Sequence, residues 1–317
     1  MKRLLFKLTK YKHLACVLEL IFNILYLPFH LIFVLNKKSI KKKQYYFCVC
    51  GIFRNEAHYL KEWIEYYKLI GTDHIYLYNN FSDDNYMEIL QPYISDGYIT
   101  LTDWPHQYAQ MAAYEDCFSK YRDKTYWLTF IDIDEFICPK YEMSIKEWIK
   151  KYEGYPAVIL YWQMFGTCGI MKPNYEKLVV EQFTTSWEKL YGVGKHIMCT
   201  NSNFEPTTIY NHHNFAKYKI LGVTFKIPMI TENRYFRFFP STNIIPYKNT
   251  IQINHYFSKS YEEYSKKIAK GSAACKKNSG IRSREDFFIN HERWNICENR
   301  VIYRFLTLLK CRMNKKD

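Results

Sequence analysis

The sequence lacks the glycine-rich fingerprints of the common nucleotide-binding folds. Its 317 residues contain neither GxGxxG nor GxxxxGK[ST], which excludes a dinucleotide-binding fingerprint and a P-loop. There is no internal repeat, and lysine runs are the only low-complexity tracts. A nucleotide site in this chain would therefore have to be built from other residues.

A Cys-x-x-Cys pair is also missing, although the chain has ten cysteines. Cys48 and Cys50 are two residues apart in an apolar run, and side chains at that spacing on a strand face the same side. They could bind zinc only with further ligands supplied by the fold; the alternative is that they are small buried apolar residues. The scattered spacing is typical of free thiols in a reducing compartment.

The body of the chain lacks an excess of positive charge. Of the net charge of +14, residues 1–43 carry +9 and residues 298–317 carry +4, which leaves +1 between them. A groove for a nucleic-acid backbone needs cations in the folded body, so we expect no nucleic-acid partner. Cations in terminal segments that also contain apolar residues favour an anionic membrane surface.

Residues 14–35 form an apolar stretch long enough to span a bilayer. It is flanked by basic residues on both sides and interrupted by Glu19, Asn23, Pro28 and His30. Spanning helices usually have asymmetric charge, so we expect a segment lying in the cytoplasmic interface, with a single span or a soluble helix as alternatives. No small-residue cleavage site follows, so a removed signal peptide is not expected.

The C-terminal stretch repeats this combination of apolar and basic residues. Residues 298–317 are predicted to form a basic amphipathic helix, with Val301, Phe305 and Leu309 among its apolar positions and Arg304 and Lys310 among its cations. Either a helix that caps the folded domain or a second membrane contact fits this pattern.

Between these ends, strand-like and helix-like segments alternate. Short apolar runs predict strands at residues 46–52, 74–79, 98–102, 125–131 and 156–165. Helical spacing predicts helices that begin at Asn55, Ser82 and Gln107, and two capping boxes that begin at Ser144 and Ser260 predict two more. The alternation predicts an α/β fold with a mostly parallel central sheet flanked by helices.

An acidic motif follows the strand at residues 125–131. Side chains alternate along a strand, so we expect Asp132 and Asp134 to point the same way, and like charges so close repel unless a cation lies between them. Carboxylate oxygens suit Mg²⁺ and Mn²⁺. We therefore expect a divalent metal site at the carboxyl end of a strand, where α/β proteins bind ligands. The alternative is an acidic surface loop.

Polar residues also follow the first two strands. Three of them lie where the first strand turns into a helix, a place that favours phosphate: Arg54, Asn55 and Glu56. Three others follow the second strand and could contact a base edge and ribose hydroxyls: Asn79, Asn80 and Asp83. A surface capping pair and an ordinary Asn-rich turn are the respective alternatives.

Four segments, in this order, carry a resemblance to a known family: residues 50–67 (CGIFRNEAHYLKEWIEYY), 74–84 (HIYLYNNFSDD), 130–136 (FIDIDEF) and 254–260 (NHYFSKS). From about residue 46 to residue 302 the chain resembles glycosyltransferase family 92. The resemblance implies a GT-A fold, related to that of family 2-like glycosyltransferases, in which a DxD motif holds a divalent metal against the diphosphate of a nucleotide sugar. It also implies inverting transfer, often from UDP-galactose.

The resemblance implies roles for individual residues. Asp132 and Asp134 would bind Mn²⁺ or Mg²⁺, Asp132 would also contact the donor, and the polar residues after the first two strands would line the nucleotide pocket. His255 would be a further metal ligand or diphosphate contact, and Lys259 would neutralise the leaving diphosphate; a core histidine and a solvated lysine are the alternatives. The base that deprotonates the acceptor has four candidates: Glu135, Glu232, Asp286 and Glu298.

The acceptor side is less well defined. Residues 194–198 (GKHIM) resemble the family's basic segment only loosely, so we do not carry over an acceptor. Trp162, Phe165 and Trp187 could stack on sugar rings or pack in the core.

The sequence thus predicts a metal-dependent enzyme that moves a hexose, most often galactose in this family, from a UDP-sugar to a cell-surface glycan or a lipid-linked saccharide at the cytoplasmic face of a membrane. Residues 1–43 would associate with the membrane. Residues 44–297 would form the catalytic domain, with a nucleotide-sugar half (44–165) and an acceptor half (166–297). The alternatives are a metal-dependent nucleotidyltransferase and a non-catalytic, membrane-peripheral binding protein.

Overall fold

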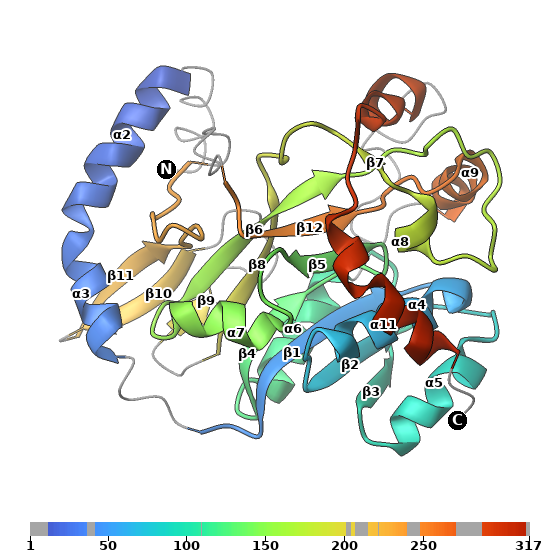
Figure 1. The fold of residues 1–317 in the computed structure, drawn as a ribbon. Coiled ribbons are helices and arrows are strands. Elements are labelled where there is room, and N and C mark those ends of the chain that lie inside the picture. Colours follow the sequence, from blue (N-terminus) through green and yellow to red (C-terminus); the bar gives the residue numbers. More distant parts are fainter. Residues whose placement is uncertain are drawn as a thin grey trace.

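The computed structural model describes residues 12–36, 42–108, 110–200, 204–206, 215–220, 222–239, 248–270 and 287–314. Two helices, α2 (Lys12–Leu25) and α3 (Leu27–Asn36), lie along one side of a body built around a large sheet (Figure 1). Within the described ranges no single helix has the length and apolar character to cross a bilayer, but the pair 13–25 and 27–35, bent by 49°, has both when taken together.

The central sheet has eight strands in the order β3-β2-β1-β4-β8-β6-β12-β5. Their bounds are β1 Tyr45–Phe53, β2 His74–Asn79, β3 Ile99–Asp103, β4 Thr125–Phe130, β5 Glu135–Pro139, β6 Ala157–Met164, β8 Gly194–Cys199 and β12 Ile251–His255. All run in one direction except β8 and β5, which are antiparallel to their neighbours. The predicted α/β fold with a mostly parallel sheet flanked by helices is confirmed.

The remaining elements cover or extend this sheet. The helices of the body are α4 (Ala57–Leu69), α5 (Tyr86–Ser95), α6 (Gln110–Tyr121), α7 (Ile145–Ile149), α8 (Val179–Gln182), α9 (Tyr261–Lys270) and α11 (Leu306–Met313). Short turns of 3₁₀ or π helix occupy Lys150–Tyr152, Phe287–His291, Glu292–Trp294 and Val301–Phe305. Small sheets are formed by β9 (Phe204–Pro206), β10 (Phe215–Ile220) and β11 (Val223–Pro228), and by β7 (Thr185–Ser186) with β13 (Cys297–Glu298).

The local signals set most of these bounds. Ser144 Oγ accepts a hydrogen bond from Lys146 N at 3.2 Å and Ser260 Oγ from Glu263 N at 3.2 Å, so both predicted helix caps are present. Helix α4 begins two residues later than expected, because Asn55 has a left-handed backbone with φ 52°. Helix α5 begins at Tyr86, beyond the predicted Ser82.

Alternate residues of β1 face two different cores, as a strand between two helical layers requires. Phe47 and Val49 pack in the cluster beneath α4, whereas Cys48 and Cys50 pack in the cluster beneath α6. Thr125 Oγ1 donates to Cys48 Sγ at 3.4 Å. Among the His, Cys, Asp and Glu side chains that the structure describes, the only group able to hold a metal contains no cysteine, so the apolar role is favoured for both.

The C-terminal segment belongs to the body. Ile302, Phe305 and Leu309 are buried, and Phe305 meets Tyr66 of α4 edge-on at 5.8 Å between ring centroids. Helix α11 lies beside α4 in Figure 1. Of the two roles open for the amphipathic stretch, the packing favours the domain-capping helix.

Candidate functional site

The strand directions bring the predicted site residues to one edge of the central sheet. The carboxyl ends of β1, β2, β4, β6 and β12 meet there, together with the first residues of the antiparallel strands β5 and β8. Ligands of open α/β sheets bind at this edge. The acidic motif, His255 and the loops after β1 and β2 all lie on it.

The acidic motif forms a turn rather than the end of a strand. Strand β4 stops at Phe130, Glu135 N donates to Asp132 O at 3.0 Å, and β5 begins at Glu135. Trp63 Nε1 donates to both Asp132 O and Glu135 O, at 3.1 and 3.2 Å, and so anchors the turn. The premise that the strand continues through Asp132 and Asp134 is therefore wrong, because β4 ends at Phe130, before the motif.

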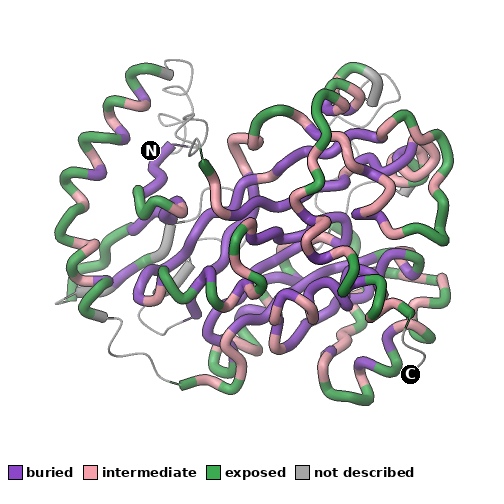
Figure 2. The backbone as a smooth tube through the Cα atoms, viewed as in Figure 1, coloured by how far each residue is buried: buried purple, intermediate pink, exposed green. Residues whose placement is uncertain are grey.

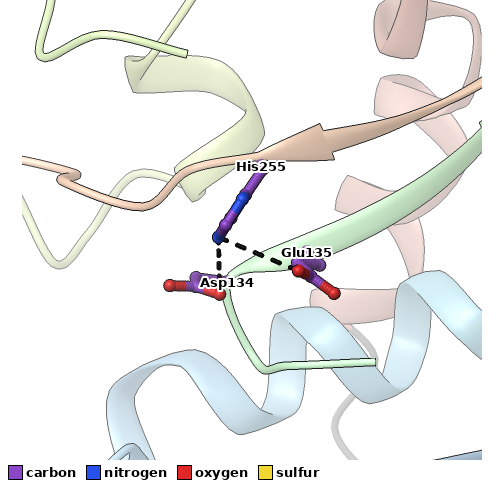
Figure 3. A group of neighbouring side chains, drawn as sticks. All are labelled: Asp134, Glu135 and His255. Carbon is purple, nitrogen blue, oxygen red and sulfur yellow. Dashed lines mark ion pairs between the residues drawn. The ribbon is translucent and has the colours of Figure 1, made fainter. Parts of the chain in front are cut away.

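Instead, Asp134, Glu135 and His255 come together, with one ligand atom of each within 4.8 Å of the others (Figure 3). His255 Nε2 lies 3.6 Å from Asp134 Oδ1 and 3.8 Å from Glu135 Oε1. The antiparallel register of β12 and β5, which pairs His255 with Glu135, produces this arrangement. Asp132, the other predicted metal ligand, lies outside the group.

The chemistry of this group fits a divalent cation. Glu135 Oε1 and His255 Nδ1 are buried without a hydrogen-bond partner, which is rare for buried polar atoms. Burial lowers the pKa of His255 even though Asp134 opposes the shift, so the imidazole stays neutral and able to ligate. Two carboxylates and an imidazole suit Mn²⁺, and Glu135 Oε1 would gain the partner that it lacks.

The two carboxylates have opposite pKa shifts. Burial raises the pKa of Glu135 well above its usual range, with Asp132 and Asp134 adding to the shift and Lys195 opposing it. Burial acts in the same direction on Asp134, but Lys267 and His255 outweigh it and hold the pKa of Asp134 well below its usual range. Without a cation, burial thus favours the neutral form of Glu135, whereas Lys267 and His255 favour the ionised form of Asp134.

Lysines surround these acids. Lys195 Nζ, at the start of β8, lies 3.0 Å from Asp132 Oδ2 and 3.5 Å from Glu135 Oε2. Lys267 of α9 forms an ion pair with Asp134. Asp132 Oδ1 also accepts hydrogen bonds from Gln110 and Tyr114 of α6, both at 3.0 Å.

The predicted Lys259 also lies at this edge and is buried. Its Nζ is 3.5 Å from Glu56 Oε2 and 3.7 Å from the centroid of the Tyr59 ring. Burial would lower the pKa of Lys259, but Glu56 and Asp134 outweigh that effect and raise it. The side chain is therefore a buried cation, not the solvated lysine that was the alternative.

Lys195 and Lys267 are site residues that sequence reasoning misses. Lys195 lies in the basic segment at residues 194–198, directly after Gly194. A Cβ on Gly194 would lie 1.8 Å from Leu160 O, so only glycine allows the close approach of β8 to β6 that places Lys195. Lys267 gives no local signal, because on α9 it has the spacing of an ordinary surface charge.

The loop after β1 is tied to the loop after β2. Asn55 N donates to Ser82 Oγ at 3.0 Å, and Asp83 N donates to Asn55 Oδ1 at 2.9 Å. Asp84 Oδ2 accepts from Ala57 N at 2.8 Å, at the first residue of α4. The expectation of free N–H groups for phosphate at this helix start is thus wrong at Ala57, where a carboxylate already binds.

Asn79 and Asn80 are buried and hold the loops. Asn79 Nδ2 donates to Asp103 Oδ1 at 3.1 Å, and its Oδ1 accepts from Ser82 N at 3.0 Å. Asn80 Nδ2 donates to the carbonyl oxygens of Trp104 and His106, both at 2.8 Å. These contacts support the Asn-rich turn for the two amides. Asp83 is exposed, and the Arg54 guanidinium lies 5.9 Å from the centroid of the Phe81 ring.

Left-handed backbone gathers in the loops along this edge. Asn55, Phe81, Tyr108 and Lys259 have φ between 50° and 58°, and they follow β1, β2, β3 and β12 respectively. Such conformations each cost of order 1–3 kcal/mol in non-glycine residues and cluster at functional sites. The left-handed residues therefore indicate a functional site at the same carboxyl edge of the sheet as the acidic side chains and His255.

Only one of the described base candidates lies at this edge. Glu232 Oε2 accepts from Thr250 N at 2.7 Å, next to the first residue of β12, whereas His255 is its last. Glu298 lies in β13, exposed and paired with Arg300. Asp286 lies outside the described residues. Glu135 remains at the site, within the group that fits a metal.

Of the three aromatic residues that could stack on sugars or pack in the core, Trp162 and Trp187 are half-buried, whereas Phe165 is fully buried. The half-buried Trp162 ring lies 4.9 Å from His255 and 6.4 Å from Tyr191, and Tyr191 lies 6.1 Å from Trp187. Phe165 is fully buried, 4.6 Å from Tyr256, and packs in the core. The half-buried rings Trp162, Tyr191 and Trp187, called the aromatic group below, continue the site from His255.

Fold and site together define an α/β protein with a buried Asp/Glu/His group that could hold a metal ion at the carboxyl edge of its sheet. The chain belongs to glycosyltransferase family 92, whose model matches residues 43–272. This match covers each of the four segments that carried the resemblance.

Several curated plant proteins are similar to the chain. A family 92 protein of Oryza sativa subsp. japonica is 34% identical over 122 residues, which cover 38% of this chain and 21% of that protein. One of Ricinus communis is 27% identical over 222 residues, covering 64% and 38% respectively. The galactan beta-1,4-galactosyltransferase GALS3 of Arabidopsis thaliana is 29% identical over 131 residues, covering 38% and 26%. The chain thus spans between 21% and 38% of the length of these relatives.

Among solved structures, that of residues 1–349 of S. aureus TarS is similar to this chain. The sequence identity is 13%, the match covers 49% of this chain and 47% of that one, and the TM-score is 0.34.

Proposed function

We propose that the protein is a metal-dependent, inverting glycosyltransferase that moves a hexose, galactose in the first instance, from a UDP-sugar to a saccharide acceptor on a cell-surface glycan or a lipid. Membership of family 92 supports the class of reaction, and similarity to GALS3 supports galactose. The single observation that carries the proposal is the buried group of Asp134, Glu135 and His255 at the carboxyl edge of the sheet.

In this proposal Asp134, Glu135 and His255 hold Mn²⁺ or Mg²⁺. When bound, the ion supplies positive charge against the negative charge that develops on the departing diphosphate. Lys195, Lys259 and Lys267 add cationic groups at the same edge, and the burial of Lys195 and Lys259 strengthens their interactions relative to water. Asp132, which keeps Lys195 as its partner, contacts the donor.

The acceptor side of the proposal uses the aromatic group. Pyranose rings present apolar C–H faces, and half-buried aromatic rings bury such faces while the sugar hydroxyls stay solvated. The group begins 4.9 Å from His255, so a sugar stacked on Trp162 would lie next to the donor site. We propose that it receives the terminal sugar of the acceptor.

The compartment is also a proposal. All nine cysteines that the structure describes have free thiols. Thiols persist in the cytosol, and lipid-linked saccharides are accessible from the cytoplasmic face of a membrane. The cytoplasmic face is therefore the location that we propose.

Thermal unfolding in the presence of ligands tests the donor and the metal. The unfolding midpoint should rise by roughly 5 °C or more with UDP-galactose at about 100 times its Kd when MnCl₂ is present, and little without MnCl₂. Asp134→Asn should lose this shift. The exposed control Glu298→Gln should keep it. An equal shift in Asp134→Asn and in the unaltered protein would refute the metal site.

Turnover separates the remaining alternatives. With a galactose-terminated oligosaccharide the protein should release UDP, and NMR of the product should show an inverted anomeric centre. Consumption of UTP with release of pyrophosphate would instead identify a nucleotidyltransferase. Donor binding without turnover on any acceptor in a glycan array would favour the non-catalytic binding protein.

A further inference from the structure

The helix pair α2–α3 exposes a continuous apolar face. Ten large apolar side chains of this face are between 45% and 71% exposed: Leu14, Val17, Leu20, Ile21, Ile24, Leu25, Leu27, Leu31, Val34 and Leu35. Figure 2 shows exposed backbone along the outer side of both helices. Soluble monomers rarely expose so large an apolar patch, so this face indicates an interaction surface.

The opposite face of α2 holds its polar residues against the body. Asn23 Nδ2 donates to Phe236 O at 3.0 Å, and Phe236 N donates to Asn23 Oδ1 at 2.6 Å. Glu19 Oε1 accepts from Phe238 N at 3.3 Å and lies 3.9 Å from Arg237. The carboxylate and the amide that interrupt the apolar stretch are therefore satisfied by protein.

Helix α3 is fixed to the body by aromatic rings. Phe33 is fully buried, and its ring lies 5.4 Å from Tyr218 and 5.6 Å from Tyr155. Tyr26, between the two helices, lies 4.9 Å from Phe238. One side of the pair is thus covered by protein from α2 to α3. A pair that crossed a bilayer would draw these segments of the body into hydrocarbon.

The apolar face continues onto the β10–β11 hairpin, which lies next to α3 in Figure 1. Phe225 meets Phe29 at 5.3 Å and is 36% exposed, and Val223 is 55% exposed. Lys217 and Lys226 of the same hairpin are exposed. Apolar side chains with lysines beside them form the pattern of a surface that enters the boundary between headgroups and acyl chains.

We propose that the outer face of α2–α3, extended by β11, docks in the plane of an anionic lipid bilayer, with the pair lying along the surface and not across it. The excess of +9 in residues 1–43 favours anionic lipid over a second copy of the chain, because two such segments would repel each other. The inference goes beyond the proposed reaction and does not depend on it.

Sedimentation with vesicles tests the proposal without donor or metal. The whole chain should bind vesicles of phosphatidylcholine with 30% phosphatidylglycerol at least tenfold more tightly than pure phosphatidylcholine, since about 1 kcal/mol per basic residue comes from anionic lipid. The double variant Ile24→Ser/Leu31→Ser should bind the anionic vesicles about tenfold or more weakly. It removes two apolar side chains that would be buried in the lipid.

The matched control is Ile289→Ser/Ile296→Ser, which alters two isoleucines that are 60% and 57% exposed elsewhere on the surface. It should bind as the unaltered chain does. Equal binding by both double variants would overturn the docking face. A lipid-free dimer that Ile24→Ser/Leu31→Ser dissociates would assign the face to a second copy. Resistance to alkaline carbonate extraction would show a spanning segment and overturn the in-plane arrangement.

Discussion

Lys195 places its ammonium 3.0 Å from Asp132, so the cation that pairs with the acidic turn comes from a residue 63 positions further along the chain. The lysine is 3% exposed, whereas Asp132 is 31% exposed. The pair therefore combines a desolvated cation with a partly solvated carboxylate, and Oε2 of the buried Glu135 lies 3.5 Å from the same ammonium.

Replacing this lysine should destabilise the fold and change its response to metal. Lys195→Met should lower the free energy of unfolding by about 2 kcal/mol, because it removes a buried cation that is hydrogen-bonded to the partly solvated carboxylate of Asp132. Added Mn²⁺ should restore more stability to the variant than it adds to the unaltered protein, since the carboxylates then lack their cation. Urea unfolding with and without MnCl₂ measures both effects. Lys189→Met, at a pair exposed by 70% and 53%, is the control and should change stability by less than about 1 kcal/mol.

His255 should determine metal affinity. We expect His255→Ala to weaken Mn²⁺ binding at least tenfold, because it removes the neutral nitrogen ligand and leaves two carboxyl groups. Isothermal titration with MnCl₂ measures the change. The exposed His58 provides a control, His58→Ala, which should bind as before. If His255→Ala bound Mn²⁺ with unchanged affinity, the metal would have to bind outside this group.

Acid should destabilise the protein through His74, which is distant from the metal group. Burial lowers the pKa of His74 from 6.5 to about 4. The folded state therefore resists protonation while the unfolded state accepts it, so stability is complete above pH 6.5 and falls as the pH drops toward 4. Thermal unfolding midpoints at pH 7.5 and pH 5 should differ more for the unaltered protein than for His74→Gln. If the unfolding midpoint changed equally between pH 7.5 and pH 5 in both proteins, the lowered pKa of His74 would be contradicted.

Substitution of a residue in the aromatic group should change the KM for the acceptor and not the KM for the donor. Trp162→Ala should raise the acceptor KM several-fold and leave the donor KM unchanged, because only the stacked sugar loses its contact. Initial rates with each substrate varied in turn separate the two constants. Phe165→Ala, in the core, should instead lower the free energy of unfolding by about 3–5 kcal/mol. A parallel rise in both KM values for Trp162→Ala would argue against an acceptor site.

Local patterns in the sequence predict the architecture well. Alternating segments identify five of the eight strands of the central sheet, β1 to β4 and β6, but not β5, β8 and β12. The serines at 144 and 260 mark helix starts, because capping depends on neighbours within a few residues. The edge that carries the site also follows from the alternation, since parallel strands share a carboxyl edge.

The arrangement of the site residues depends on contacts between distant parts of the chain, so the sequence alone does not predict it. His255 and Glu135 meet because of the register between β12 and β5, which no local period encodes. The acidic motif has the spacing of a strand but closes as a turn, since Trp63 of α4 binds its carbonyl oxygens. Glu19 lies in an apolar helix because its carboxylate accepts a hydrogen bond from Phe238 N, a partner 219 positions away that no local pattern reveals.

The packing of α11 on α4 bears on how the enzyme can be shortened for laboratory work. The family match stops at residue 272, yet Phe305 and Leu309 lie in the same core as Trp63. A recombinant fragment that ends at residue 272 would expose the apolar side chains of α4 that α11 covers, and we expect it to aggregate when expressed. A usable truncation has to retain the chain at least through Met313.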